Sequence, residues 1–70
     1  MSKIQSIYAL QSDGYTPSKL FKWIVNNGIL PIKKYHILGN EIRFRIRDPN
    51  SKKKYITKIL SNGIHLVIQI

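Results

Sequence analysis

Asn27-Gly28-Ile29 recurs as Asn62-Gly63-Ile64, 35 positions later in a chain of 70 residues. Each copy follows a stretch whose apolar residues have helical spacing, and each precedes a stretch with the composition of a strand. Asn and Gly tolerate the left-handed backbone conformation that ends a helix. We therefore expect each Asn-Gly pair to end a helix, and the repeat divides the chain into two strand-helix-strand halves, at about 3–38 and 41–70.

The first half begins with a predicted strand over residues 3–11, which is apolar on both faces and is therefore expected to be central in a sheet. Thr16-Pro17 has the residue types of a helix N-cap and a first helical position. The helix that starts there is expected to end at Asn27-Gly28. Residues 29–38 predict a second strand. Pro31 cannot donate a ladder hydrogen bond, so this strand should lie at a sheet edge or begin after Pro31.

The second half begins after Gly39-Asn40, a two-residue turn of the kind that closes a hairpin. Residues 41–47 alternate apolar side chains with arginines and predict a third strand. Asp48-Pro49 repeats the cap-then-proline signal, so a second helix is expected from there, or from Ser51, to Asn62-Gly63. Its apolar stripe would consist of Tyr55, Ile56, Ile59 and Leu60. Residues 64–70 predict a last strand.

The predicted order is strand-helix-strand-strand-helix-strand, in a single domain over residues 1–70. Two right-handed β-α-β units joined by a hairpin give an α+β, ferredoxin-like βαββαβ sandwich. Its four-stranded antiparallel sheet would carry both helices on one face, with the first and third strands central and the second and fourth at the edges. A winged-helix-like domain is the alternative, in which residues 16–47 would form the recognition helix and the wing.

The charge of the chain is its most unusual property. Twelve Lys and Arg residues stand against three acidic residues, which gives a net charge of +9 and a pI of about 10.2. Such an excess predicts attraction to a polyanion, although a lysine-rich surface also keeps a small protein in solution. No stretch has the roughly 20 apolar residues that a membrane span needs. The start of the chain also lacks the apolar core of a signal peptide, so a cytoplasmic location is expected.

Arginines on the third predicted strand give the strongest indication of a function. If the apolar residues of that strand face the helices, three guanidinium groups lie on the open sheet face, about 6.6 to 7 Å apart along the strand. They belong to Arg43, Arg45 and Arg47. Arginine binds phosphate through paired hydrogen bonds, so this Arg ladder can follow a nucleic-acid backbone. The alternative is a solvated face whose charge only prevents sheets from stacking.

Five lysines extend the predicted surface: Lys33 and Lys34 on the second strand, and Lys52, Lys53 and Lys54 at the start of the second helix. Cations at a helix N-terminus oppose the helix dipole, which favours a ligand as the reason for their presence. The other interpretation is a flexible, solvated run of charge. The predicted function is a small nucleic-acid-binding protein that contacts DNA or RNA phosphates with weak sequence preference and steep salt dependence.

A protein-interaction or dimerisation module is the alternative function, including a virus- or mobile-element-encoded factor that binds a host protein. A 70-residue chain has a small core, and pairing into a homodimer would stabilise it. The last strand, with Leu66, Ile68 and Ile70 on one side, is the predicted pairing edge.

Catalysis and metal binding are not expected. The chain has no Cys, and neither His36 nor His65 has an acidic companion nearby in the sequence. A glycine-rich phosphate-binding loop is also missing from the sequence. We therefore predict no enzyme activity, no cofactor, no metal and no small-molecule substrate.

Overall fold

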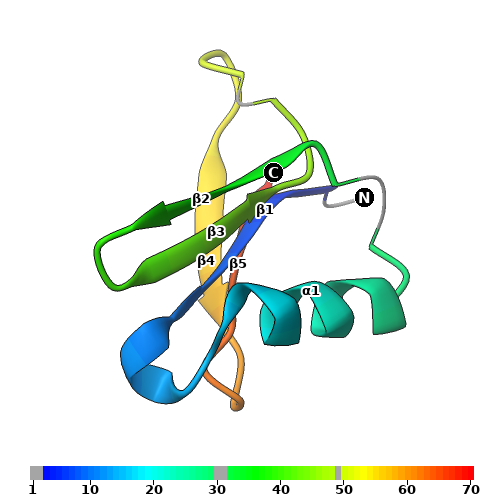
Figure 1. Ribbon diagram of the computed structural model, residues 1–70. Helices are drawn as coiled ribbons and strands as arrows, with labels where there is room; N and C mark the ends of the chain where they lie inside the picture. The colour runs from blue at the N-terminus through cyan, green and yellow to red at the C-terminus, as the bar shows by residue number, and fades with distance from the viewer. Residues whose placement is uncertain (1–2, 30–31, 49) are drawn as a thin grey trace.

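A computed structural model describes residues 3–29, 32–48 and 50–70 (Figure 1). One antiparallel sheet contains the strands β1 (Lys3–Leu10), β2 (Lys34–Leu38), β3 (Glu41–Arg45), β4 (Tyr55–Ile59) and β5 (His65–Gln69). The strand order is β2-β3-β1-β5-β4, so β1 is the central strand. A 3₁₀ helix, η1 (Gln11–Asp13), and an α-helix, α1 (Pro17–Asn26), lie between β1 and β2 in the chain. α1 lies across one face of the sheet.

The prediction of α1 is confirmed at both ends. The Thr16 hydroxyl accepts a hydrogen bond from the Lys19 backbone N–H at 3.1 Å, and Pro17 is the first helical residue. After the helix, Gly28 has a φ of +69° and donates its N–H to the Val25 carbonyl at 3.0 Å. A glycine in this left-handed conformation is a common way for a helix to end.

The second predicted helix is absent from the described residues. The prediction of a ferredoxin-like fold is therefore wrong. β4 lies in the middle of the segment expected to be helical, and it pairs antiparallel with β5. Before β4, Asn50 organises a loop: its carbonyl oxygen accepts from the Lys53 N–H at 3.0 Å, and its side-chain oxygen accepts from the Lys52 N–H at 2.9 Å. The Tyr55 hydroxyl accepts the Asn50 N–H at 2.7 Å. Tyr, Ile and Thr favour strands, and here that preference prevails over the helical spacing.

Asn62-Gly63 does not end a helix. Gly63 has a φ of +88° and lies in the turn between β4 and β5, where its N–H donates to the Leu60 carbonyl at 3.0 Å. The Leu60 N–H donates in turn to the Ile64 carbonyl at 2.8 Å. The same residue types serve at both copies of the repeat because a helix end and a tight turn both need a residue with positive φ. The repeat therefore marks two different chain reversals and not two similar halves.

The strand order confirms one predicted edge and corrects the other. β2 lies at an edge, as expected, although Pro31 itself lies outside the described residues, as does Pro49. The last strand, β5, is predicted at the opposite edge, but it lies between β1 and β4. The proposed pairing edge of β5 is therefore already occupied within the chain. A winged-helix-like domain fits no better, because α1 is the one α-helix among the described residues.

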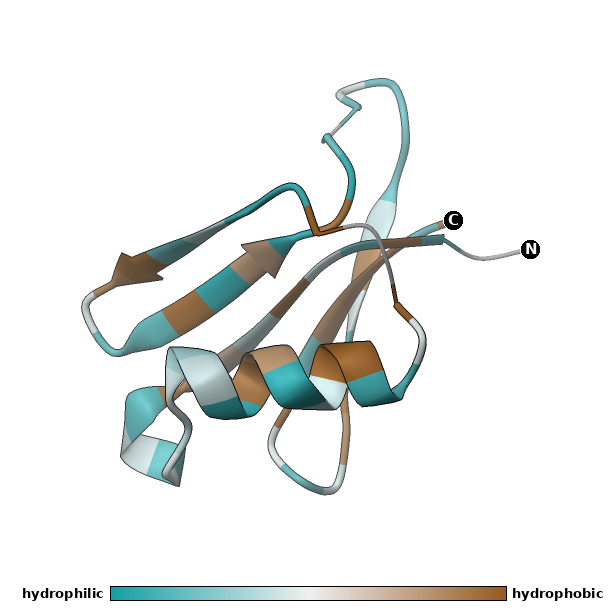
Figure 2. Cartoon of the chain, turned by 45° about the vertical axis from the view of Figure 1, so that its right-hand side comes forward, coloured by the Kyte–Doolittle hydropathy of each residue, from teal (hydrophilic) through white to brown (hydrophobic). Residues whose placement is uncertain are grey.

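The core lies between α1 and the sheet face that it covers. The register aligns Ile42 of β3 with Ala9 of β1, and Phe44 with Ile7. Figure 2 shows the matching alternation of hydrophobic and hydrophilic residues along β3. The buried apolar side chains are Ile7, Ala9, Leu20, Ile24, Ile42, Phe44, Ile46 and Ile64. We call this covered side of the sheet the helix side.

Shortening one core side chain should destabilise the domain. Ile42 is fully buried, so Ile42→Val is expected to lower the free energy of unfolding by about 1 kcal/mol. Ile56, which is half exposed on β4, allows the same substitution as a control, and Ile56→Val should change that free energy by less than about 0.5 kcal/mol. Urea unfolding followed by circular dichroism measures both variants. Equal losses would contradict this core.

Candidate nucleic-acid interface

The sheet face opposite α1 is open, and the strand register decides which side chains share it. Tyr8 aligns with Arg43 on β3 and with His65 on β5. His36 on β2 aligns with Arg43 in turn. Directly aligned residues of antiparallel strands project to the same face, and neighbours along a strand project to opposite faces. Because Ile7 is in the core, Tyr8 and the residues aligned with it project away from α1. We call this surface the open face.

Three side chains of this row form a continuous stack. The ring centroids of Tyr8 and His65 are 4.5 Å apart, and the ring planes differ by 8°. From the other neighbouring strand, the central guanidinium carbon of Arg43 lies 4.6 Å from the centroid of the Tyr8 ring. The Nε of Arg43 also donates to Oε2 of Glu41 at 3.2 Å. The cation–π contact and this ion pair both restrict the Arg43 side chain, and the ring stacking restricts the Tyr8 side chain.

The Arg43–Tyr8–His65 stack covers both faces of the Tyr8 ring. Sheet-surface RNA-binding domains typically stack unpaired bases on exposed aromatic rings. Tyr8 cannot receive a base in this way, because Arg43 lies on one face of its ring and His65 on the other. The groups that the row presents to a ligand are polar, chiefly the guanidinium N–H donors of Arg43. This arrangement suits phosphate oxygens better than bases.

Further cations lie along the open face in the next rows. Lys34 of β2 aligns with Arg45 of β3, and Arg45 aligns with Ser6 of β1. These residues are two positions from the Arg43 row, so they share its face. Lys3 aligns with Gln69 of β5, which is four positions from His65 and therefore also on the open face. The register thus gathers basic side chains from three strands on one surface.

The structure brings Arg43 and Arg45 together on the open face, whereas Arg47 lies beyond the end of β3. Its N–H donates to the Gln5 carbonyl at 3.0 Å, and its own carbonyl accepts from Nε2 of Gln5 at 2.9 Å. The strand alternation therefore ends at Arg45, and the Arg47 backbone is held against β1.

The predicted lysines fall into separate places. Lys34 is on the open face, whereas Nζ of Lys33 forms a 2.9 Å ion pair with Oδ2 of Asp48. That ion pair lowers the pKa of the Asp48 carboxyl, with smaller contributions from Arg45 and Lys34. The lysines at positions 52–54 are exposed in the loop between β3 and β4 and not at a helix N-terminus. The dipole argument for their role therefore no longer applies.

Sequence reasoning did not place Tyr8 and His65 in the site. Residues 3–11 are apolar at both parities, so the sequence leaves the direction of Tyr8 ambiguous. His65 has no local signal at all, because it joins the stack only through the pairing of β5 with β1. The register of the sheet is the information that was missing.

Other kinds of site find no support in the part of the chain that the structure describes. That part contains no group of three or more His, Cys, Asp or Glu residues placed to hold a metal ion. Nor does it contain a helix with the length and apolar character to cross a membrane.

No protein-family model, curated protein or solved structure matches this chain. The geometry and charge of the open face therefore carry the functional argument.

Removing the Lys33 amino group should raise the pKa of Asp48 toward its ordinary value of 3.8. Because folding depresses this pKa, the ion pair stabilises the fold above the ordinary pKa. That contribution is lost as the pH falls through the folded value. The stability difference between Lys33→Met and the wild type should therefore shrink below about pH 3.8.

Carboxyl NMR titration measures this pKa directly, and urea unfolding at several pH values measures the stability difference. Lys22→Met is the control, because Lys22 is exposed on α1 and does not perturb Asp48. An unchanged Asp48 titration in Lys33→Met would show that the ion pair does not form in solution.

Proposed function

We propose that the chain binds the phosphate backbone of a nucleic acid through the open face. The observation that carries the proposal is the set of cations that the register aligns on neighbouring strands: Arg43, Arg45 and Lys34. Two of the three are arginines, whose planar guanidinium groups suit phosphate oxygens. The net charge of +9 supports the same ligand class, since it attracts polyanions over a longer range.

Arg43 is held by contacts on two sides, from the Tyr8 ring and from Glu41. Its contact with the Tyr8 ring restricts the side chain before a ligand arrives, so less conformational entropy is lost on binding. Glu41 accepts from Nε of Arg43 at 3.2 Å and more weakly from a terminal nitrogen at 3.5 Å. A guanidinium group has five N–H donors, so several stay available to a phosphate.

Backbone contact predicts the character of the binding. Phosphates carry no sequence information, and the Tyr8 ring offers no free face to a base, so sequence preference should be weak. Affinity should fall steeply with salt, because each neutralised phosphate releases condensed counterions. DNA and RNA share this backbone chemistry. A cytoplasmic location is part of the proposal, since the ligand must be accessible to the protein.

Arg43→Ala/Arg45→Ala should weaken binding and flatten its salt dependence. Loss of two phosphate contacts lowers the slope of log K against log salt by roughly two for a duplex, and by somewhat less for a single strand. Fluorescence anisotropy at several salt concentrations measures this, with a labelled single strand and a labelled duplex of the same sequence.

The matched control is Lys19→Ala/Lys22→Ala, which removes two exposed charges from α1, on the other side of the sheet. The slope of this control should stay close to that of the wild type. Circular dichroism verifies that both double variants are folded. If the two variants lose affinity and slope equally, net charge and not the open face governs binding, and the proposal is wrong.

Tyr8→Leu tests whether the stack positions Arg43. Leucine keeps an apolar side chain at this place and removes the cation–π contact, which is worth about 0.5–1 kcal/mol at an exposed site. We expect nucleic-acid affinity to fall by about two- to fivefold, which is this free energy expressed as a ratio of dissociation constants. The salt slope should not change, since no charge is lost. Unchanged affinity in a folded Tyr8→Leu variant would contradict the positioning role of Tyr8.

A further inference from the structure

β2 presents a free sheet edge. All of its residues are exposed, and no described strand pairs with its outer side. The two-residue turn Gly39-Asn40 follows β2, and Leu38 and Glu41 form the aligned pair next to it. In such a hairpin the pair beside the turn is hydrogen-bonded and the bonding then alternates. Tyr35 and Ile37 therefore direct their backbone N–H and C=O groups outward, away from β3.

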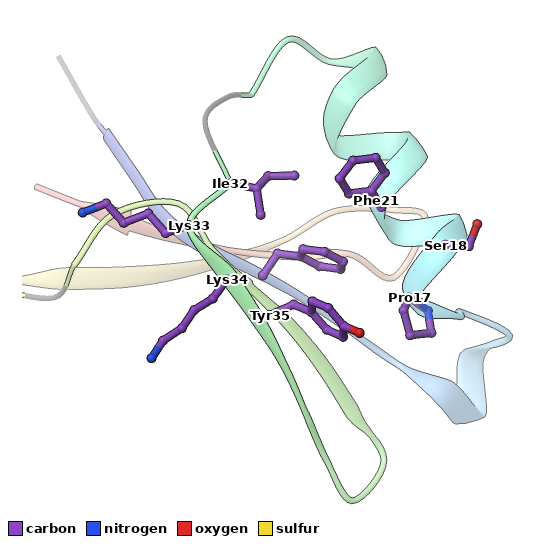
Figure 3. Close-up of a pocket in the computed structure, with 8 residues that line it drawn as sticks. Pro17, Ser18, Phe21, Ile32, Lys33, Lys34 and Tyr35 are labelled. Atoms are coloured by element: carbon purple, nitrogen blue, oxygen red, sulfur yellow. The ribbon is translucent and has the colours of Figure 1, made fainter.

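A pocket of about 440 Å³ lies between this edge and α1 (Figure 3). Most of its lining is apolar, from Pro17, Phe21, Ile32, Tyr35 and Phe44. The Phe44 ring centroid lies 5.3 Å from that of Tyr35 and 6.2 Å from that of Phe21. Tyr35 is 55% exposed and Phe21 is 46% exposed. A side chain from outside can therefore reach an aromatic surface directly beside the free edge.

The rim of the pocket is basic. Lys33 and Lys34 are the charged residues of its lining, and Figure 3 shows their side chains extending away from the aromatic rings. Nζ of Lys33 is paired with Oδ2 of Asp48 at 2.9 Å, so Lys34 is the rim lysine whose charge no ion pair among the described residues compensates. A partner segment that carries acidic residues around one apolar residue would therefore match both the pocket and its rim.

We propose that β2 accepts an extended acidic peptide segment of a partner protein as an added strand, with one apolar side chain in the pocket beside α1. The outward backbone groups of Tyr35 and Ile37 would supply affinity, and the pocket would supply specificity, as in other cases of strand addition. A second copy of this chain is a poorer occupant, because two chains of charge +9 repel each other and lysines at an edge oppose self-pairing.

The probe is a short, capped, fluorescein-labelled peptide in which Glu alternates with Val and one central Val is replaced by Phe. We expect saturable binding by fluorescence anisotropy and slower amide hydrogen exchange at Tyr35 and Ile37 by NMR. The same peptide with Gln in place of Glu should bind about tenfold more weakly, because it lacks the charge that matches the rim.

Variants locate the site. Tyr35→Ala removes an aromatic wall of the pocket and should weaken peptide binding about tenfold or more. Ile37→Pro removes an outward N–H and should also block the added strand, while the hydrogen bonds between β2 and β3 remain. Ile56→Ala is the matched control and should bind normally. Ile56 is 50% exposed and lies on the helix side of the other edge strand, β4.

Three results would overturn the proposal. The first is failure of the folded wild-type protein to bind the Glu-containing peptide. The second is binding that survives in Tyr35→Ala and is lost in Arg43→Ala/Arg45→Ala, which would assign the peptide to the open face. The third is a dimer in sedimentation that Ile37→Pro abolishes, which would identify a second copy of the chain as the occupant of the edge.

Discussion

The pairing of β1 on both sides is the constraint on which the rest of the structure depends. Ile7 aligns with Phe44 on β3 and with Leu66 on β5, and this row faces α1. The next residue, Tyr8, aligns with Arg43 and His65 on the opposite face. Because side chains along a strand alternate with a period of two, a slip of one residue would exchange the faces of both rows. Burial of the core therefore also determines which residues meet on the open face.

An irregularity around Gln5 ends the alternation of β3. The pairing of β1 with β5 shifts register between Ile4 and Ser6. On the β3 side, the Gln5 carbonyl accepts the N–H groups of both Ile46 and Arg47, at 2.8 and 3.0 Å. Gln5 is buried, and its side chain donates to the Arg47 carbonyl as well. Such an irregularity bends the ladder locally. The alternation that carries Arg43 and Arg45 consequently stops before Arg47, a change that a reading of residues 41–47 as one straight strand cannot anticipate.

The helix and strand that are predicted correctly are marked by residues within them or directly beside them in the sequence. Thr16-Pro17 and Asn27-Gly28 bound α1 by their own conformational preferences, and the alternation after Gly39-Asn40 identifies β3 and the direction of its arginines. The prediction of a second helix is wrong because the apolar spacing within Tyr55–Ile59 fits a helical stripe as well as a strand. The β-branched residues of that segment favour a strand. The lysines before it oppose a helix dipole. Those lysines are therefore evidence against a helix and not evidence for a ligand.

β2 belongs to both proposed surfaces, because its side chains project alternately to the two faces of the sheet. Lys34 projects with Arg45 to the open face and also lines the pocket rim, whereas Tyr35 projects to the helix side. An acidic peptide at the edge would place negative charge near Lys34 and compete electrostatically with phosphate there. Such a coupling is reciprocal, so a nucleic acid on the open face would weaken peptide binding by the same factor. Salt screens charges that are separated by more than about 10 Å at 0.1 M, so the coupling should be confined to the Lys34 side of the open face.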